Sequence, residues 1–127
     1  MKKLLLALMP IALCAAVPAA RADETGLAAI HEMRYEHGHK ICMSDHFHDG
    51  SGNGQTRKQA ESAAIGSWAS FTSFEYGSSW GSYALAADRK MDCHENGSKA
   101  WACLTTARPC MRHAGPVRRS GSRAASR

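Results

Sequence analysis

TRKQAESAAIGSWASFTSFEYG, residues 56–77, is the stretch that decides the fold of this 127-residue chain. Its apolar residues form one stripe at helical spacing: Ala60, Ala64, Trp68 and Phe71, with Ile65 and Ala69 beside them. Thr56 is followed three residues on by Gln59, which is a capping-box pattern for a helix start. Gly77 is a typical stop. The sequence therefore predicts an amphipathic helix between Thr56 and Gly77.

The segments that follow this helix predict a second helix and a hairpin. SSWGSYALAADRK, residues 78–90, gathers its aromatic and alanine side chains at helical spacing. KMDC (90–93) and AWACLTTA (100–107) read as two strands around Asn96-Gly97, a strong hairpin turn signal. We expect an α+β domain, in which one or two short amphipathic helices pack on a small antiparallel hairpin or sheet, stabilised by disulfides.

The residues that precede the helix predict less regular structure. Leu27, Ile30 and Arg34 fall at helical spacing, which indicates a short helix within residues 25–37. Residues 42–49, CMSDHFHD, are too polar for a core element. Residues 50–54, GSGNG, have the composition of a flexible linker or exposed loop.

The N-terminus has the pattern of a cleavable secretory signal peptide over residues 1–22. Lys2 and Lys3 precede an uncharged apolar run, and Ala20-Arg21-Ala22 fits a signal-peptidase site. A membrane anchor and a lipoprotein acylated at Cys14 are the alternatives, but the run is short for a span. We expect a periplasmic or secreted protein with no transmembrane segment in the mature chain.

Four cysteines remain after removal of this signal, and an even number in a small exported domain indicates two disulfides. Three pairings are open. We favour Cys93–Cys103, which flanks the predicted hairpin, and this leaves Cys42–Cys110 to close the longer loop. Free thiols are an alternative, and a zinc site of four cysteines lacks the expected closely spaced pairs.

Charge divides the mature chain into a folded part and a tail. Residues 23–110, the predicted single domain, carry eight Lys and Arg against all 11 Asp and Glu, a net charge of −3. Residues 111–127 hold five arginines and little apolar material, which predicts a basic disordered tail. A mildly acidic domain is not expected to bind nucleic acid, and the sequence names no other partner.

Histidines are concentrated between residues 31 and 48. They include two H-x-H pairs, His37 with His39 and His46 with His48. In an extended strand each pair presents both imidazoles to one side, so the four side chains are candidate ligands for Zn²⁺, Cu²⁺ or Ni²⁺. The alternative is a solvated histidine-rich loop with no cofactor.

No motif predicts catalysis. GSGNGQT, residues 50–56, lacks the lysine of a phosphate-binding loop, and Ser67 lacks the second glycine of a nucleophile elbow. The aromatic residues are expected to form the core rather than a groove. The leading hypothesis is a non-enzymatic binding or envelope-associated module. The alternative is a periplasmic metal-binding protein that uses the histidine-rich segment 37–48.

Three stretches also carry a resemblance: DHFHDGSG, KQAESAAIGSWASFTSFEYGSSW and CHENGSKAWACLTTARPC. Over about residues 45–110 the chain resembles a group of small exported, cysteine-containing proteins of alphaproteobacteria. The resemblance implies a folded domain that includes the D-H-F-H segment, Asp45 to His48. It carries over no activity, ligand or catalytic residue.

Overall fold

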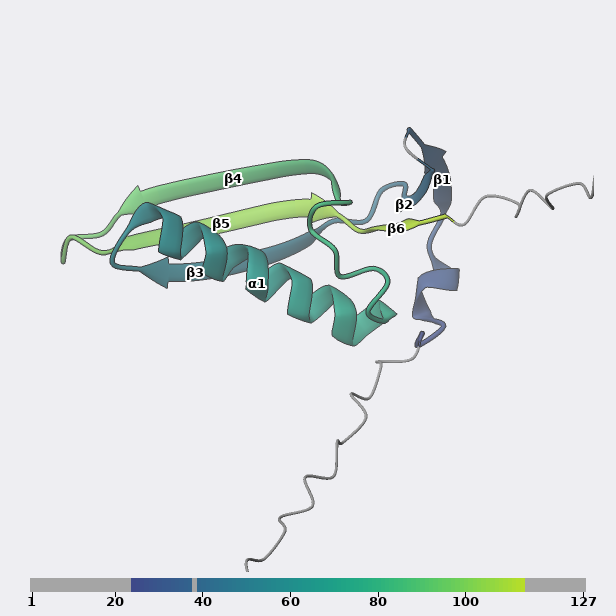
Figure 1. Cartoon of the computed structure of the whole chain (residues 1–127), viewed down its shortest axis with the longest axis horizontal. Helices are drawn as coiled ribbons and strands as arrows, with labels where there is room; N and C mark the ends of the chain where they lie inside the picture. Colours follow the sequence, from purple (N-terminus) through teal and green to yellow (C-terminus); the bar gives the residue numbers. More distant parts are fainter. Residues whose placement is uncertain (1–23, 38, 114–127) are drawn as a thin grey trace, which may run out of the picture.

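The computed structural model describes residues 24–37 and 39–113, which form an α+β domain as predicted. The elements in chain order are η1 (Leu27–Ile30), β1 (Met33–Glu36), β2 (Lys40–Met43), β3 (His48–Gly54), α1 (Arg57–Tyr76), β4 (Ala87–Glu95), β5 (Trp101–Arg108) and β6 (Cys110–Arg112). Two antiparallel three-stranded sheets result, with strand orders β3-β5-β4 and β1-β2-β6. Helix α1 lies along the first sheet, and the second sheet lies beyond its end (Figure 1).

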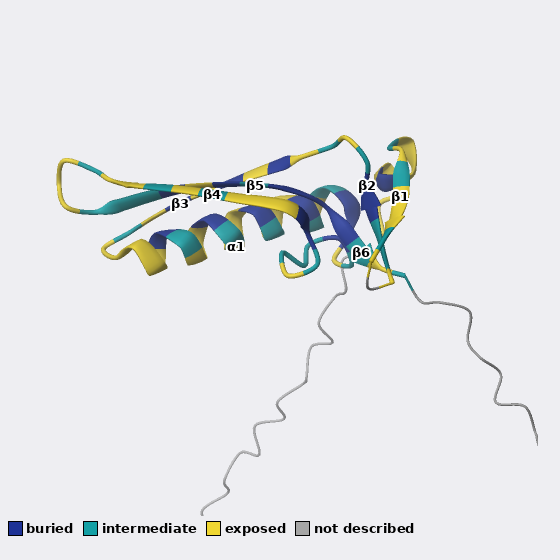
Figure 2. Ribbon diagram, turned by 90° about the horizontal axis from the view of Figure 1, so that it is seen from above, coloured by how far each residue is buried: buried dark blue, intermediate teal, exposed yellow. Residues whose placement is uncertain are grey.

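Helix α1 forms where the sequence predicts it and with the predicted caps, but the prediction that Phe71 belongs to its buried stripe is wrong, because that side chain is 49% exposed and Thr72 takes the buried position. The Thr56 side chain accepts a hydrogen bond from the Gln59 amide, the Gln59 side chain returns one, and Gly77 is the C-cap. Buried segments recur along the helix where it lies beside the first sheet (Figure 2). The fully buried residues recur every four positions: Ala60, Ala64, Trp68, Thr72 and Tyr76. Two of these five are polar, so the buried face of the helix also carries hydroxyl groups into the interior.

The prediction of a linker over residues 50–54 is wrong, because these residues form most of β3. Buried and exposed residues alternate along the strand, and Gly50, Gly52 and Gly54 face α1. A Cβ at Gly50 would lie 2.6 Å from the backbone nitrogen of Trp68. The helix therefore packs directly on bare strand backbone. Glycines weaken a strand in isolation, which is why the composition indicated a loop.

The hairpin prediction is confirmed by β4 and β5, which pair antiparallel around a loop at residues 96–100. Asn96 organises this loop, because its side-chain oxygen accepts from the amides of Ser98 and Ala100. Cys93 and Cys103 occupy opposed positions of the two strands and are bonded to each other. We refer to this bond as the hairpin disulfide.

Of the two other helix predictions, the one over residues 78–90 is wrong and the one within residues 25–37 is confirmed only for Leu27–Ile30. Residues 78–86 form turns and β4 begins at Ala87, so no second α-helix follows α1 within residues 77–113. Trp80 is nevertheless buried, in a cluster with Tyr76 and Met43, so its packing replaces the expected helical face. In residues 25–37 only η1 is helical, and Met33–Glu36 pairs with β2 instead. Tertiary pairing has overridden a weak local helical pattern.

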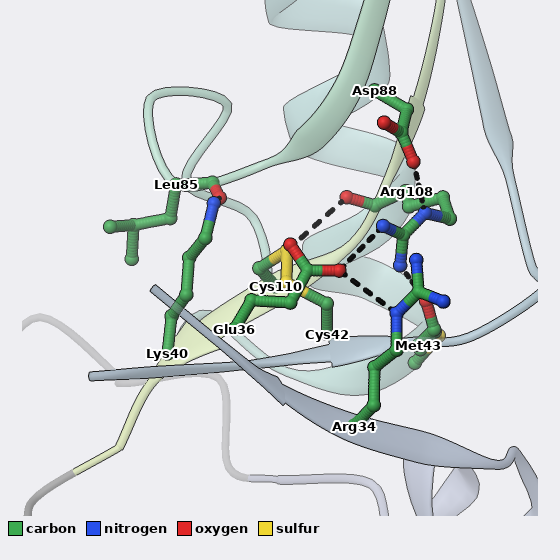
Figure 3. Close-up of a disulfide and its surroundings, with 9 residues drawn as sticks. All are labelled: Arg34, Glu36, Lys40, Cys42, Met43, Leu85, Asp88, Arg108 and Cys110. Carbon is green, nitrogen blue, oxygen red and sulfur yellow. Dashed lines mark hydrogen bonds and ion pairs between the residues drawn. A yellow bond between two sulfur atoms is a disulfide. The ribbon is translucent and has the colours of Figure 1, made fainter. Parts of the chain in front are cut away.

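The two sheets are joined where β5 continues through Pro109 into β6 (Figure 1). Cys42 and Cys110 oppose each other in the second sheet and form the other bond that the sequence favoured, which we call the junction disulfide (Figure 3). The Arg108 side chain is 2% exposed, and it donates to Glu36, Asp88 and the Met43 carbonyl. One buried cation thus fastens the second sheet to the end of the first.

The boundaries of the domain differ slightly from those expected. Cys42, Met43, His48 and Asp49 belong to strands, so the segment 42–49 is less irregular than its polarity suggested. Strand β6 continues to Arg112, two residues into the expected tail.

The signal peptide predicted over residues 1–22 and the tail from 114 onward lie outside the described residues. Within the described part, no helix has the length and apolarity needed to span a membrane.

Candidate metal site at the end of helix α1

Polar side chains from three parts of the chain meet at the C-terminal end of α1. His46 lies in the connection that leads into β3, and His48 is the first residue of that strand. Glu75 and Tyr76 belong to the last turn of the helix. The buried helix stripe brings Tyr76 inward, and the adjacent Glu75 remains about one-third exposed beside it. The packing of the end of α1 against the start of β3 therefore assembles the site.

Contacts with the helix favour one tautomer of His48. The Thr72 hydroxyl donates to the Trp68 carbonyl at 2.7 Å, so it accepts from Nδ1 of His48, 2.9 Å away. A hydroxyl has one hydrogen, and the carbonyl already takes it. This arrangement favours the tautomer with the proton on Nδ1 of His48, in which Nε2 of the neutral ring presents an unshared electron pair. Metal-ligating histidines are commonly fixed in this way by a partner of the other ring nitrogen.

The bare Nε2 of His48 faces two further metal-ligating groups. It lies 3.2 Å from Oε2 of Glu75 and 3.0 Å from Nε2 of His46. The ligand atoms of all three residues lie within 4.8 Å of one another. Two atoms that each lie about 2.0–2.1 Å from a tetrahedral zinc ion are about 3.3 Å apart. The observed spacing is close to that of a coordination shell.

Burial disfavours the protonated, charged form of both imidazoles. Desolvation lowers the pKa of His48, and the opposing charge of Glu75 does not compensate for it. Desolvation also lowers the pKa of His46, and the neighbouring His31 lowers it further. With His48 neutral, its Nε2 and the Glu75 carboxylate are both acceptors, and acceptors do not bond to each other. The His48 nitrogen can accept from Nε2–H of His46, 3.0 Å away, or it can share a cation with Glu75.

Tyr76 links the cluster to a third histidine. Its hydroxyl lies 3.0 Å from Nε2 of both His46 and His31. Burial raises the pKa of Tyr76 to about 12, together with the charge of Glu75 and a hydrogen bond to it, so the phenol stays protonated. The ring of His31 lies 4.3 Å from that of His46 between centroids. His31 is therefore adjacent to the cluster through Tyr76 but is not one of its three converging ligands.

The structure brings together half of the predicted metal ligands. His46 and His48 converge, whereas His37 and His39 lie exposed in the β1–β2 turn of the other sheet. Among the described residues, neither belongs to a group that could hold a metal ion. Sequence reasoning missed Glu75, Thr72 and Tyr76. The sequence did offer one signal, because Thr72 and Tyr76 continue the helical stripe of buried residues. Buried hydroxyl groups require hydrogen-bond partners, so these two residues indicate a polar cluster at this end of the helix.

A second grouping, Glu36 with Cys42 and Cys110, does not offer metal ligands. Both sulfurs are bonded to each other in the junction disulfide. The Glu36 carboxylate is engaged by Arg108 at 2.6 Å and Arg34 at 3.1 Å (Figure 3). Burial alone would raise the pKa of Glu36, but the hydrogen bonds from these arginines outweigh it and hold the pKa below its usual range. This cluster is an ion-pair network that joins the sheets.

Two hollows in the surface flank the histidine cluster. One, of about 330 Å³, is lined by His46, Phe47, His48, Asp49, Phe71 and Glu75. The other, of about 150 Å³, is lined by His31, Glu32, Asp45 and His46. All three converging ligands border the larger hollow, so solvent and small molecules reach the site from that side.

No protein-family profile, curated protein or solved structure matches this chain.

Proposed function

We propose that this protein is an exported, non-enzymatic metal-binding protein that holds one Zn²⁺ ion through His46, His48 and Glu75. The observation that carries the proposal is the bare Nε2 of His48, which faces the Glu75 carboxylate at 3.2 Å. In the tautomer that the Thr72 hydroxyl favours, this nitrogen has no proton to offer. A divalent cation is the species that satisfies both groups without charging a buried imidazole.

The donor set selects the class of metal. Two imidazole nitrogens and one carboxylate suit Zn²⁺, Cu²⁺ or Ni²⁺, whereas Ca²⁺ and Mg²⁺ prefer shells of oxygen ligands. Zinc accepts the short, near-tetrahedral spacing seen between Nε2 of His46 and Nε2 of His48. Copper would compete for the same donors, because it binds most nitrogen sites more tightly than zinc does.

Export to the periplasm or the medium is part of the proposal. Two disulfides stabilise the described domain, and such bonds persist mainly in oxidising compartments. The signal-peptide pattern at residues 1–22 points the same way. In such a compartment the four cysteines of the mature chain are bonded to each other, so they do not compete for metal as thiolates. The histidine and carboxylate groups are then the remaining donors.

Isothermal titration with Zn²⁺ tests the site on protein purified without a histidine tag. We expect one equivalent to bind, and we expect Glu75→Gln to weaken the affinity at least about 100-fold, since it removes a direct ligand and its charge. The matched control is the double variant His37→Ala/His39→Ala, which removes two exposed imidazoles outside the cluster. Weakening by the control and not by Glu75→Gln would place the metal in the β1–β2 turn and refute this site.

A further inference from the structure

We propose that the metal held by His46, His48 and Glu75 keeps one coordination position open, and that this position takes a neutral aromatic nitrogen base of the imidazole class. The proposal rests on the metal site above and names its external ligand. Three protein ligands with a fourth position left to a small molecule is a common arrangement for zinc sites that bind exchangeable ligands.

The direction of the open position follows from the larger hollow. His46, His48 and Glu75 all line that hollow of about 330 Å³, so an ion held by them borders it. Tyr76 is fully buried, and its hydroxyl lies 3.0 Å from Nε2 of His46. The fourth ligand therefore enters from the hollow, whose volume is in the range of small-molecule sites.

The walls of the hollow favour a flat ring. Phe47 and Phe71 both line it, and they are 45% and 49% exposed. The Phe71 ring already lies against His48, with 4.8 Å between the ring centroids. An aromatic ligand that bonds to the metal would cover apolar surface of both phenylalanines, which adds stacking contacts to the metal bond.

The charges around the hollow select a neutral donor over an anion. Asp49 and Glu75 both line it, and Glu32 and Asp45 line the adjoining smaller hollow. A carboxylate or phosphate in the fourth position would meet these negative side chains at short range, whereas a neutral ring nitrogen would not. Imidazole nitrogen is also a preferred donor for zinc, copper and cobalt.

Visible absorption of the Co²⁺-loaded protein tests the proposal, because the cobalt bands report metal binding and a change of fourth ligand separately. The untagged chain is titrated with imidazole, benzimidazole, acetate and benzoate. We expect benzimidazole to shift the bands at roughly 3- to 10-fold lower concentration than imidazole, and benzoate to bind more weakly than either. Phe71→Ala should remove that advantage of benzimidazole, when the probe concentrations are compared with the cobalt affinity measured on the same variant.

The control is Phe74→Ala, which removes a ring that is 84% exposed and does not line the hollow. Cobalt bands that no probe shifts would show a closed coordination shell and overturn this inference alone. Benzoate binding as tight as benzimidazole would overturn the class of ligand. Absence of cobalt bands would overturn the metal site itself and this inference with it.

Discussion

A methyl group at position 52 would force apart the two elements that form the site. In Gly52→Ala, the added Cβ would lie 2.5 Å from Cβ of Ala63 and 2.6 Å from the Ala60 carbonyl oxygen, with the Ala64 amide nitrogen closer still. Carbon atoms in good contact lie about 3.5–4.0 Å apart. The helix must therefore retreat by about 1 Å from β3, because backbone atoms cannot rotate away as a side chain can.

The expected cost is at the upper end of the range for overpacked cores, about 3 kcal/mol. Gly66→Ala is the matched control, because Gly66 lies exposed in the same helix and a Cβ there meets no atom within 4 Å. That variant should gain about 0.5–1 kcal/mol from helix propensity. The two variants make the same chemical change and should shift stability in opposite directions.

Urea unfolding followed by tryptophan fluorescence measures both variants, because Trp68 is fully buried between α1 and the sheet. We expect the free energies of unfolding to differ by about 4 kcal/mol between Gly52→Ala and Gly66→Ala. Equal stability of Gly52→Ala and the parent chain would refute the close packing of α1 on strand backbone. It would also remove the reason for placing Glu75 beside His48.

Three further outcomes follow from the contacts described. Thr72→Val removes the hydroxyl that accepts from His48, so zinc affinity should fall about 10- to 100-fold. Thr72→Ser keeps a hydroxyl and should retain the affinity. Equal zinc affinity of the parent chain and both variants would argue against the favoured tautomer. Glu36 has a lowered pKa in the fold, so its contribution to stability is present above its unfolded value of 4.5 and is lost as pH falls through the folded value. The chain should therefore lose stability in acid, and Glu36→Gln should flatten that dependence in urea titrations across pH; an unchanged profile would count against the Arg108 network. Replacing both cysteines of the junction disulfide by alanine should cost about 4 kcal/mol and those of the hairpin disulfide about 3 kcal/mol, because the bonds span 68 and 10 residues, and a reversed order in urea unfolding would contradict this.

Local signals in the sequence were enough to predict the elements whose geometry they set directly. The Thr56–Gln59 capping pair and the apolar stripe predicted α1, and cysteine spacing with Asn96-Gly97 predicted the hairpin and both disulfides. Strand β3 was missed because its glycines are required by the approach of the helix, which only the folded chain reveals. Local pattern also failed at residues 78–86, where the packing of Trp80 decides the path of the chain.

The sequence predicted only those ligands of the candidate site that lie close together in the chain. His46 and His48 alternate along one stretch of chain, so their shared direction followed from strand geometry. Glu75 lies 27 residues beyond His48 in the sequence, and only the packing of α1 on β3 brings the two together. His37 and His39 show the same H-x-H pattern but lie in a turn of the other sheet. Spacing alone could not distinguish the two pairs.

Native mass spectrometry of the untagged protein, recovered from the periplasm and exposed to one equivalent of zinc, tests the metal site most directly. The account predicts one bound zinc ion per chain, retained in His37→Ala/His39→Ala and lost in Glu75→Gln. The same spectra should show a mass about 4 Da below that of the reduced chain, one hydrogen for each of the four bonded cysteines. Less than about a tenth of an equivalent of zinc, copper or nickel on a chain with both disulfides formed would contradict the account.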